Sequence, residues 1–194
     1  MTDPSNGYEA VAKIYIAGRG TGGTIGASEV RQWARELPPG SPVLDLGCGT
    51  GVPISQALFE SGLVVHGVDA SPTLIAAFRA RFPAAPAECS TVEDSQFFYR
   101  TFAGVVAWGL MFLLSPASQA LLIQKVAAAL DPGGLFLFTS PELACEWLDG
   151  MTDLPSISLG ADRYAALLRA EGLALVGHRR GAGDNFYYLA EKPS

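Results

Sequence analysis

Three glycines alternate with other residues directly after an apolar run in the stretch VLDLGCGTGVP, residues 43–53. Glycine has no side chain, so the backbone at Gly47, Gly49 and Gly51 can adopt left-handed conformations and approach a ligand closely. The apolar run is typical of a buried strand, and the residues after the loop have helical spacing. A strand, a glycine-rich turn and a helix N-terminus together bind nucleotides. The stretch therefore indicates a nucleotide-like ligand.

The glycine spacing separates this loop from two other nucleotide-binding motifs. Dinucleotide sites use G-x-G-x-x-G, and their third glycine would fall here at Val52. A phosphate-binding P-loop ends in Gly-Lys-Ser/Thr, which this stretch does not contain. Instead, Asp45 precedes the glycines, and Asp69 closes the next strand-like run, LVVHGVD, eighteen residues after Gly51. The pattern to explain is thus G-x-G-x-G with one acidic residue on each of two neighbouring strands.

The stretch VLDLGCGTG resembles motif I, D/E-x-G-x-G-x-G, of the class I S-adenosylmethionine-dependent methyltransferases, and VVHGVDAS fits that family's second landmark. The resemblance covers residues 42–140 well and implies S-adenosylmethionine as the cofactor. It implies that the glycines line the methionine and ribose, that Asp45 steadies the loop near the amino group, and that Asp69 binds the ribose hydroxyls. The cofactor-binding residues that it implies are Asp45, Gly47, Cys48, Gly49, Gly51, Asp69, Ala70, Thr91, Val92, Glu93, Trp108, Gly109 and Arg19.

Several of these residues have two interpretations. The resemblance puts Ala70 beside the adenine and Thr91 in the adenine-contacting loop, where the family often has an aspartate. Trp108 ends the fourth strand, next to the expected transfer site, but a tryptophan there could equally be part of the core. Arg19 could reach the carboxylate of the cofactor or could simply be a solvated loop residue.

The sequence offers no obvious general base and no metal site. His66 lies inside a strand-like run and His178 lies on a late one, so structural or surface roles are expected for both. No cluster of histidine, cysteine and aspartate has metal-ligand spacing. The three cysteines indicate incidental thiols, and Cys48 is interpreted as a small filler residue in the loop. Catalysis is therefore expected to depend on proximity and orientation rather than on a dedicated base.

Strand-like runs and helical patterns alternate from residue 42 onward. Ser71-Pro72 and Ser115-Pro116 are N-cap and N1 pairs that begin helices, and Asp131-Pro132-Gly133-Gly134 is expected to form a turn. The strands are apolar on both faces, which favours a parallel sheet between two helix layers. LALVGHRR and DNFYYLAE flank a short glycine link and predict a hairpin, so the last strand runs antiparallel. The predicted fold is α/β: a Rossmann-like, seven-stranded, mostly parallel sheet in a three-layer α-β-α sandwich.

The first forty residues differ from the rest of the chain. They predict two helices, at about residues 5–17 and 27–37, separated by the glycine-rich stretch GRGTGGTIG. Five glycines within nine residues leave the first helix free to swing. We therefore expect residues 1–40 to form an N-terminal helical lid or cap over a methyltransferase domain of residues 41–194, within one structural domain overall.

Composition and charge argue against nucleic-acid and membrane partners. Hydrophobic residues make up 49% and charged residues 16% of the chain, and the formal net charge is −6, which does not suit a nucleic-acid partner. The longest apolar stretch, FAGVVAWGLMFLL, is shorter than the roughly 20 residues of a membrane-spanning helix, and the start resembles no signal peptide. We expect a cytoplasmic protein, a monomer or a homodimer, with no nucleic-acid or membrane partner.

A small-molecule methyl acceptor with a nitrogen, sulfur or oxygen nucleophile fits these constraints. Amino-methylating nucleic-acid enzymes carry an Asn/Asp-Pro-Pro-aromatic tetrapeptide where this chain has WGLM. The acceptor pocket is expected to combine the segment before residue 41, the stretch after Trp108 and residues 141–158. Two alternatives remain open: a protein that binds S-adenosylmethionine or S-adenosylhomocysteine without transferring methyl, and a nicotinamide-dependent oxidoreductase, which Val52 disfavours.

Overall fold

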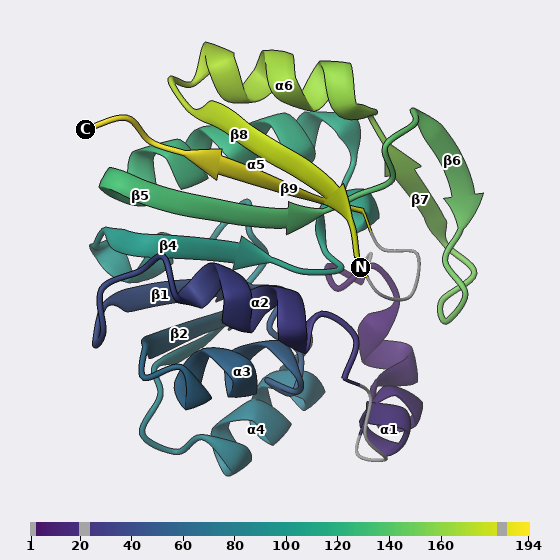
Figure 1. Cartoon of the computed structure of the whole chain (residues 1–194). Coiled ribbons are helices and arrows are strands. Elements are labelled where there is room, and N and C mark those ends of the chain that lie inside the picture. Colours follow the sequence, from purple (N-terminus) through teal and green to yellow (C-terminus); the bar gives the residue numbers. More distant parts are fainter. Residues whose placement is uncertain (1–2, 20–23, 182–185) are drawn as a thin grey trace.

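The computed structural model describes residues 3–19, 24–181 and 186–194. Within these residues a seven-stranded sheet has the order β3-β2-β1-β4-β5-β9-β8 (Figure 1). β9 is antiparallel to both of its neighbours, β5 and β8, and the remaining pairs are parallel. This confirms the predicted sheet. Its strands are β1 (Pro42–Leu46), β2 (Val64–Asp69), β3 (Ala87–Cys89), β4 (Phe102–Ala107), β5 (Leu130–Thr139), β8 (Ala174–Arg180) and β9 (Phe186–Glu191).

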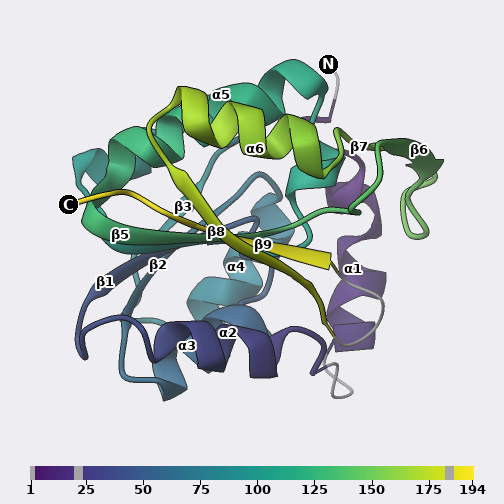
Figure 2. The ribbon, with the colours of Figure 1, turned by 45° about the horizontal axis from the view of Figure 1, so that its top comes forward.

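Helices cover both faces of the sheet, which confirms the three-layer architecture (Figure 2). One layer contains α5 (Pro116–Ala129) and α6 (Ala161–Ala170). The other contains α2 (Ala27–Ala34), α3 (Ile54–Glu60) and α4 (Pro72–Arg81). α1 (Tyr8–Arg19) belongs to neither layer and stands beyond the ends of the strands. Two short 3₁₀ helices, η1 (Phe97–Tyr99) and η2 (Met111–Leu113), lie on either side of β4 in the chain.

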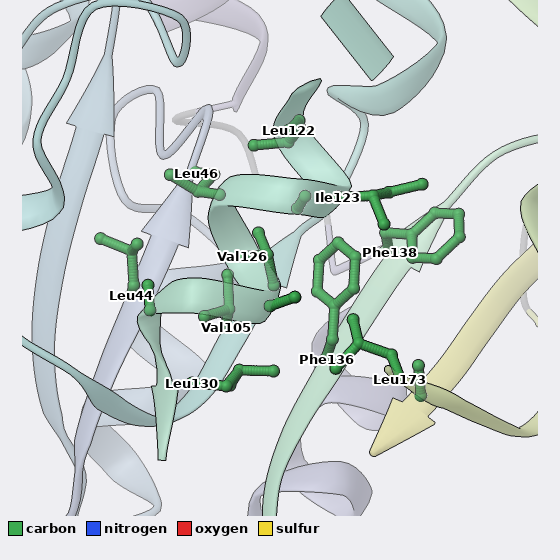
Figure 3. Close-up of a cluster of buried hydrophobic side chains, with 14 of the residues drawn as sticks. Leu44, Leu46, Val105, Leu122, Ile123, Val126, Leu130, Phe136, Phe138 and Leu173 are labelled. Atoms are coloured by element: carbon green, nitrogen blue, oxygen red, sulfur yellow. The ribbon is translucent and has the colours of Figure 1, made fainter. Parts of the chain in front are cut away.

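A buried apolar cluster fixes α5 on the sheet (Figure 3). Leu122, Ile123 and Val126 of α5 meet Val105 of β4 and Phe136 of β5, and all five side chains are at most 1% exposed. Burying a side chain of this size contributes about 1.5–3 kcal/mol relative to leaving it exposed. The strands therefore have a rigid support from which to present their C-terminal ends.

α2 packs into a second cluster on the opposite face of the sheet. Val30 is fully buried and Trp33 is 5% exposed. A Cβ on Gly104 of β4 would lie 2.7 Å from the Trp33 ring, so only a glycine lets the indole approach the strand this closely. The second half of the predicted lid segment is thus packed against the sheet, and α1 is the part that stands apart from it.

Three local predictions differ from the structure. The predicted turn at residues 131–134 is part of β5, where the pairing with β4 shifts register. The connection of residues 141–158 contains a two-stranded antiparallel sheet of β6 (Cys145–Leu148) and β7 (Pro155–Ser158). The residues of β6 are largely exposed and lack the apolar alternation that marks a strand, so no signal in the sequence predicts it. α1 begins at Tyr8 rather than near residue 5, because Asn6 and Gly7 have left-handed φ values of +52° and +84°, and the Ser5 hydroxyl accepts the Glu9 N–H at 2.8 Å.

None of the helices in the described part of the chain is long and apolar enough to cross a membrane.

Candidate active site

The glycine loop after β1 requires its glycines. Gly47, Gly49 and Gly51 have φ values of +68°, +53° and +81°, in the left-handed region that side chains rarely adopt. The N–H of Gly47 donates to the Val68 carbonyl at 2.8 Å, which ties the loop to β2. A Cβ on Gly51 would lie 2.4 Å from the Phe82 ring. Both the backbone conformation and the close packing therefore demand the alternation seen in the sequence.

Asp69 joins the glycine loop to the beginning of α4. Its Oδ2 accepts the N–H of Gly49 and its Oδ1 accepts the N–H of Ser71, each at 2.8 Å. Burial raises the pKa of Asp69, and the two backbone hydrogen bonds oppose that rise. Each carboxylate oxygen has a second lone pair for a ligand hydroxyl. The end of β2 thus presents an oriented carboxylate beside the glycine loop.

Asp45 lies beneath the loop rather than beside a ligand site. It is 1% exposed, and the Ser55 hydroxyl of α3 donates to its Oδ2. Burial raises the pKa of Asp45 to about 7, and the nearby charge of Asp69 adds to the rise, while the Ser55 hydrogen bond opposes it. The structure therefore gives Asp45 a place under the loop, where it holds the beginning of α3.

A cavity of about 620 Å³ opens at the C-terminal ends of β1, β2 and β4. This is the edge where open α/β sheets bind their ligands, since the strand order reverses between β1 and β4. Asp45, Cys48 and Gly51 do not line it, and the side chain of Arg19 lies outside the described residues. The predicted residues that line it are Gly47, Gly49, Asp69, Ala70, Thr91, Val92, Glu93, Trp108 and Gly109.

The loop after β3 is fixed by a residue that the sequence analysis missed. The ammonium group of Lys125, on α5, donates to the carbonyl oxygens of Val92, Glu93 and Ser95 at 2.6–2.7 Å. Nothing in the sequence singles out this lysine, because an isolated lysine on a helix is normally solvated. The Thr91 hydroxyl bonds to Asp94 at 3.0 Å and accepts its N–H at 3.1 Å. Lys125 therefore fixes the backbone of the loop after β3, which forms part of the cavity wall.

Trp108 is at once part of the core and part of the cavity. It packs against the α2 cluster, with its ring 6.2 Å from that of Tyr187, and it lines the cavity. A Cβ on Gly26 would lie 2.4 Å from the Trp108 ring, so the chain entering α2 passes directly over the indole. The next residue, Gly109, donates its N–H to the buried Thr139 hydroxyl at 2.7 Å. The end of β4 is thus rigid on both sides.

Two neighbouring side chains at the N-terminal end of α1 bind this helix to other elements beside the cavity. Glu9 accepts hydrogen bonds from the hydroxyls of Ser71 and Thr73 and from the Thr73 N–H, which fastens α1 to the first turn of α4. These hydrogen bonds lower the pKa of Glu9. Tyr8 donates to Oδ2 of Asp149 at 3.3 Å, in the turn between β6 and β7. α1 therefore bridges the loop after β2 and the β6–β7 hairpin (Figure 1).

A buried polar network holds the β6–β7 hairpin on the body. The Tyr164 hydroxyl of α6 donates to Gln119 at 2.7 Å and shares a 2.8 Å hydrogen bond with Ser140. Gln119 donates in turn to the Ile157 carbonyl of β7 at 2.9 Å. Each of these buried polar groups has a partner, as a stable interior requires. The hairpin is therefore a fixed wall, and residues on its turn have defined positions.

Both histidines lie outside the residues that line the cavity. His66 is 5% exposed, and burial lowers its pKa, with the nearby charge of Arg100 adding to the effect. His178 is exposed on β8, against the rings of Phe186 and Tyr188. Within residues 3–19, 24–181 and 186–194, no group of three or more histidine, cysteine, aspartate or glutamate side chains could hold a metal ion.

Parts of the chain are similar in sequence to known methyltransferases. Residues 43–134 match the family described as "Methyltransferase domain". An uncharacterized methyltransferase of Synechocystis sp. is 32% identical over 112 residues, which make up 58% of this chain and 52% of that protein. A tRNA U34 carboxymethyltransferase of Hahella chejuensis is 32% identical over 147 residues, which make up 70% of this chain and 42% of that protein. The chain thus spans about half the length, or less, of these curated relatives.

Among solved structures, a Burkholderia thailandensis 1,6-didemethyltoxoflavin-N1-methyltransferase superposes with a TM-score of 0.73. The alignment covers 100% of this chain and 92% of that one at 18% identity. That structure contains bound 1,6-didemethyltoxoflavin and S-adenosylhomocysteine. At this identity the likeness concerns the fold alone.

Proposed function

We propose that this chain is a class I S-adenosylmethionine-dependent methyltransferase that transfers a methyl group from S-adenosylmethionine to a small-molecule acceptor, in keeping with the match of residues 43–134 to a methyltransferase domain. The observation that carries the proposal is the combination of the left-handed glycine loop and the Asp69 carboxylate on one cavity wall.

The residues present fit the cofactor. Gly47 and Gly49 line the cavity without side chains, and a Cβ on Gly49 would lie 3.2 Å from the Tyr15 hydroxyl. Asp69 offers both carboxylate oxygens at the end of β2. The volume of about 620 Å³ is within the usual range for small-molecule sites. Under the proposal these glycines hold the methionine, Asp69 binds the ribose hydroxyls, and Ala70 lies beside the adenine.

The remaining assignments follow from the two walls of the cavity. Thr91, Val92 and Glu93 would contact the adenine from the loop that Lys125 holds. Trp108 and Gly109 would lie beside the methyl group, and Arg19 would approach the cofactor carboxylate. Asp45, Cys48 and Gly51 would act from below, by shaping the loop.

When bound, S-adenosylmethionine supplies an electrophilic methyl group, which an acceptor lone pair takes as the carbon–sulfur bond breaks and sulfur keeps the electron pair. The task left to the chain is orientation, since holding reacting atoms about 3–3.5 Å apart can by itself contribute about 7–11 kcal/mol. Rigid walls at Trp108 and at the β6–β7 hairpin suit that task. Under the proposal the transfer uses no histidine base, and neither His66 nor His178 lines the cavity.

A small acceptor is favoured over a nucleic acid. The formal net charge of −6 opposes binding to a phosphate backbone, although one curated relative is a tRNA-modifying enzyme by name. Apolar side chains from α1, η2 and the hairpin turn form a large part of the cavity wall. That wall suits an apolar or amphipathic molecule.

Under the same proposal, α1 is a lid that orders further when the cavity is filled. Its anchors are the Glu9 hydrogen bonds to α4 and the Tyr8 contact with Asp149. Both anchors are side-chain contacts between separate elements and lie outside the apolar core clusters, so they can open and close without disturbing the core, as lids require.

Titration calorimetry with S-adenosylmethionine, S-adenosylhomocysteine and NADH tests the cofactor. We expect the first two to bind and NADH not to bind, whereas the reverse would make the chain a nicotinamide enzyme. Radiolabelled S-adenosylmethionine, offered with metabolite extracts or with total tRNA, then tests the acceptor. Label in small molecules supports the proposal, label in tRNA refutes the small-molecule assignment, and binding without any transfer would identify a binding protein.

A further inference from the structure

The acceptor side of the cavity is apolar and aromatic. Its wall is made by the end of β4, by η2 and by the turn of the β6–β7 hairpin, and Phe112 of η2 packs against Trp147 of β6 with ring centroids 5.3 Å apart. Such a wall binds a molecule through its hydrocarbon or ring surface. The side chains that form it are Trp108, Leu110, Phe112, Leu113, Leu114 and Met151.

The charges that line the cavity all have one sign. Among the described residues that line it, the charged side chains are Asp69, Glu93 and Asp149, with no lysine, arginine or histidine. Asp69 and Glu93 belong to the cofactor side under the proposed function. Asp149 is therefore the charged group of the acceptor side, and it would repel a carboxylate or phosphate placed there.

Asp149 is buried and oriented. It is 8% exposed, and its Oδ1 accepts the N–H groups of Met151 and Thr152 at 3.0 Å and the Thr152 hydroxyl at 3.2 Å. Its Oδ2 accepts the Tyr8 hydroxyl at 3.3 Å, a long contact. No cationic side chain of the described residues forms an ion pair with it. A buried carboxylate is stabilised by further N–H donors, and a ligand in the cavity can supply one.

A second polar side chain that lines the cavity has a buried atom without a partner. The Nδ2 atom of Asn6 is buried and has no hydrogen-bond partner among the described residues. Asn6 lines the cavity, two residues before Tyr8. A buried donor without a partner costs about 1–3 kcal/mol, so an acceptor atom of a bound ligand would relieve that cost. Asn6 and Asp149 thus offer a donor and an acceptor to one molecule.

We infer that the methyl acceptor is an apolar or aromatic amine whose N–H group is bound by Asp149, with Tyr8 orienting the carboxylate; this inference rests on the proposed function. Asp149 is then a specificity-determining residue that selects nitrogen nucleophiles and rejects anionic acceptors. A neutral amine attacks with its lone pair, and the new nitrogen–carbon bond replaces the carbon–sulfur bond, whose electron pair stays on sulfur. The nitrogen becomes positively charged beside the Asp149 carboxylate, which stabilises that charge, and the surplus proton leaves to water when the product is released.

The test uses Asp149→Asn, because asparagine keeps an Oδ1 acceptor for the Met151 and Thr152 N–H groups, while the negative charge is lost and an NH2 group replaces the Oδ2 acceptor. Asp153→Asn is the matched control: this exposed residue lies in the same turn and does not line the cavity, and its φ of +54° suits asparagine as well as aspartate. Methyl transfer is measured with four pools of acceptors that share carbon skeletons and differ in the end group: amines, thiols, alcohols and carboxylates.

We expect the full chain to methylate the amine pool in preference to the other three. Asp149→Asn should lower kcat/KM for the amines by about 10- to 100-fold, the value of a hydrogen bond to a charged group. Its affinity for S-adenosylhomocysteine should stay within about twofold, and Asp153→Asn should match the unaltered chain in both measurements.

Three results would overturn the inference: preference for another pool, unaltered amine turnover in Asp149→Asn, or no methylated amine from a protein that still binds S-adenosylhomocysteine. A protein that binds neither S-adenosylmethionine nor S-adenosylhomocysteine would instead overturn the proposed function, so the two failures are distinguishable.

Discussion

Replacing Asp69 separates its binding role from its structural role. In the structure its two carboxylate oxygens each accept one backbone N–H, from Gly49 and from Ser71, at 2.8 Å. Under the proposed function the same oxygens accept the ribose hydroxyls. Asp69→Ala removes these acceptors, and a hydrogen bond to a charged group contributes about 1.5–3 kcal/mol. We expect cofactor affinity to fall by that amount, which is about 10- to 150-fold in Kd.

Asp69→Asn gives a sharper comparison, because the charge of Asp69 is not stabilising in the folded state. Burial raises its pKa above the ordinary value for aspartate, in spite of the two backbone hydrogen bonds. A raised pKa means that the unfolding free energy falls as pH rises from the ordinary value through the folded one. Asparagine removes this penalty and loses one acceptor, worth about 0.5–1.5 kcal/mol. We expect a Tm within about 4 °C of the unaltered chain, together with at least about tenfold weaker binding.

Calorimetry with S-adenosylhomocysteine and thermal unfolding across pH 4–8 measure both quantities. Asp162→Asn, at the exposed start of α6, removes one negative charge away from the cavity and should leave affinity unaltered. Unaltered affinity in Asp69→Ala would refute the ribose assignment. Weak binding accompanied by a large loss of Tm in Asp69→Asn would show that Asp69 is structural alone.

Three further predictions concern the histidines, the lid and the glycine loop. His66→Gln and His178→Gln should each keep kcat within about tenfold, because a general base typically contributes about 10²–10⁴-fold; a hundredfold loss with intact cofactor affinity in steady-state assays would reveal a missed base. Glu9→Gln should speed hydrogen exchange in α1, which S-adenosylhomocysteine should slow in the unaltered chain; unaltered exchange in both cases would exclude a lid. The pKa of Glu9 is lowered in the folded protein, so Glu9 contributes to stability above the ordinary glutamate pKa, and this contribution disappears as the pH falls through the pKa of the folded state. Glu9→Gln should abolish this pH dependence of the unfolding free energy, measured by urea unfolding. Gly51→Ala should cost more stability than Gly62→Ala in the same assay, because both have positive φ but only Gly51 also meets a ring at 2.4 Å; equal costs would contradict the packing argument.

The sheet and the glycine loop were predictable because their signals are local. A strand buried on both faces is a short apolar run, and the left-handed backbone after β1 requires glycine at Gly47, Gly49 and Gly51. The Ser71 and Ser115 caps also form as predicted, with hydroxyls that accept the N–H groups of Leu74 and Ser118. In each case, neighbours in the sequence determine the conformation.

The contacts that α1 makes at the site were not predictable, because they join distant parts of the chain. Glu9 reaches residues more than sixty positions away, and Tyr8 reaches a residue 141 positions away. The sequence placed three segments around the acceptor, and the cavity does combine those segments. Which side chain meets which depends on the packing of α1 and of the hairpin, and a single sequence carries no signal of that pairing.

Asp45 shows that a motif can predict the type of a residue without predicting what the residue contacts. The motif gives an acidic residue before the glycines, but burial and Ser55 decide what that residue does. With a pKa raised to about 7, Asp45 is partly protonated near neutral pH, and it bonds the beginning of α3. Under the proposed function, Asp45 would act on a ligand through the loop above it, as a positioning residue.

The two anchors of α1 connect cofactor binding with acceptor binding. Tyr8 and Glu9 are adjacent at the first turn of one helix, yet Tyr8 bonds to the acceptor wall at Asp149 and Glu9 bonds to the beginning of α4, directly after the cofactor wall at Asp69. Because a helix moves as a rigid body, α1 cannot leave one wall without disturbing its contact with the other. Ordering of the Glu9 contact by the cofactor would therefore also orient the carboxylate that we assign to the acceptor amine, so that the acceptor site is completed only after the methyl donor is in place.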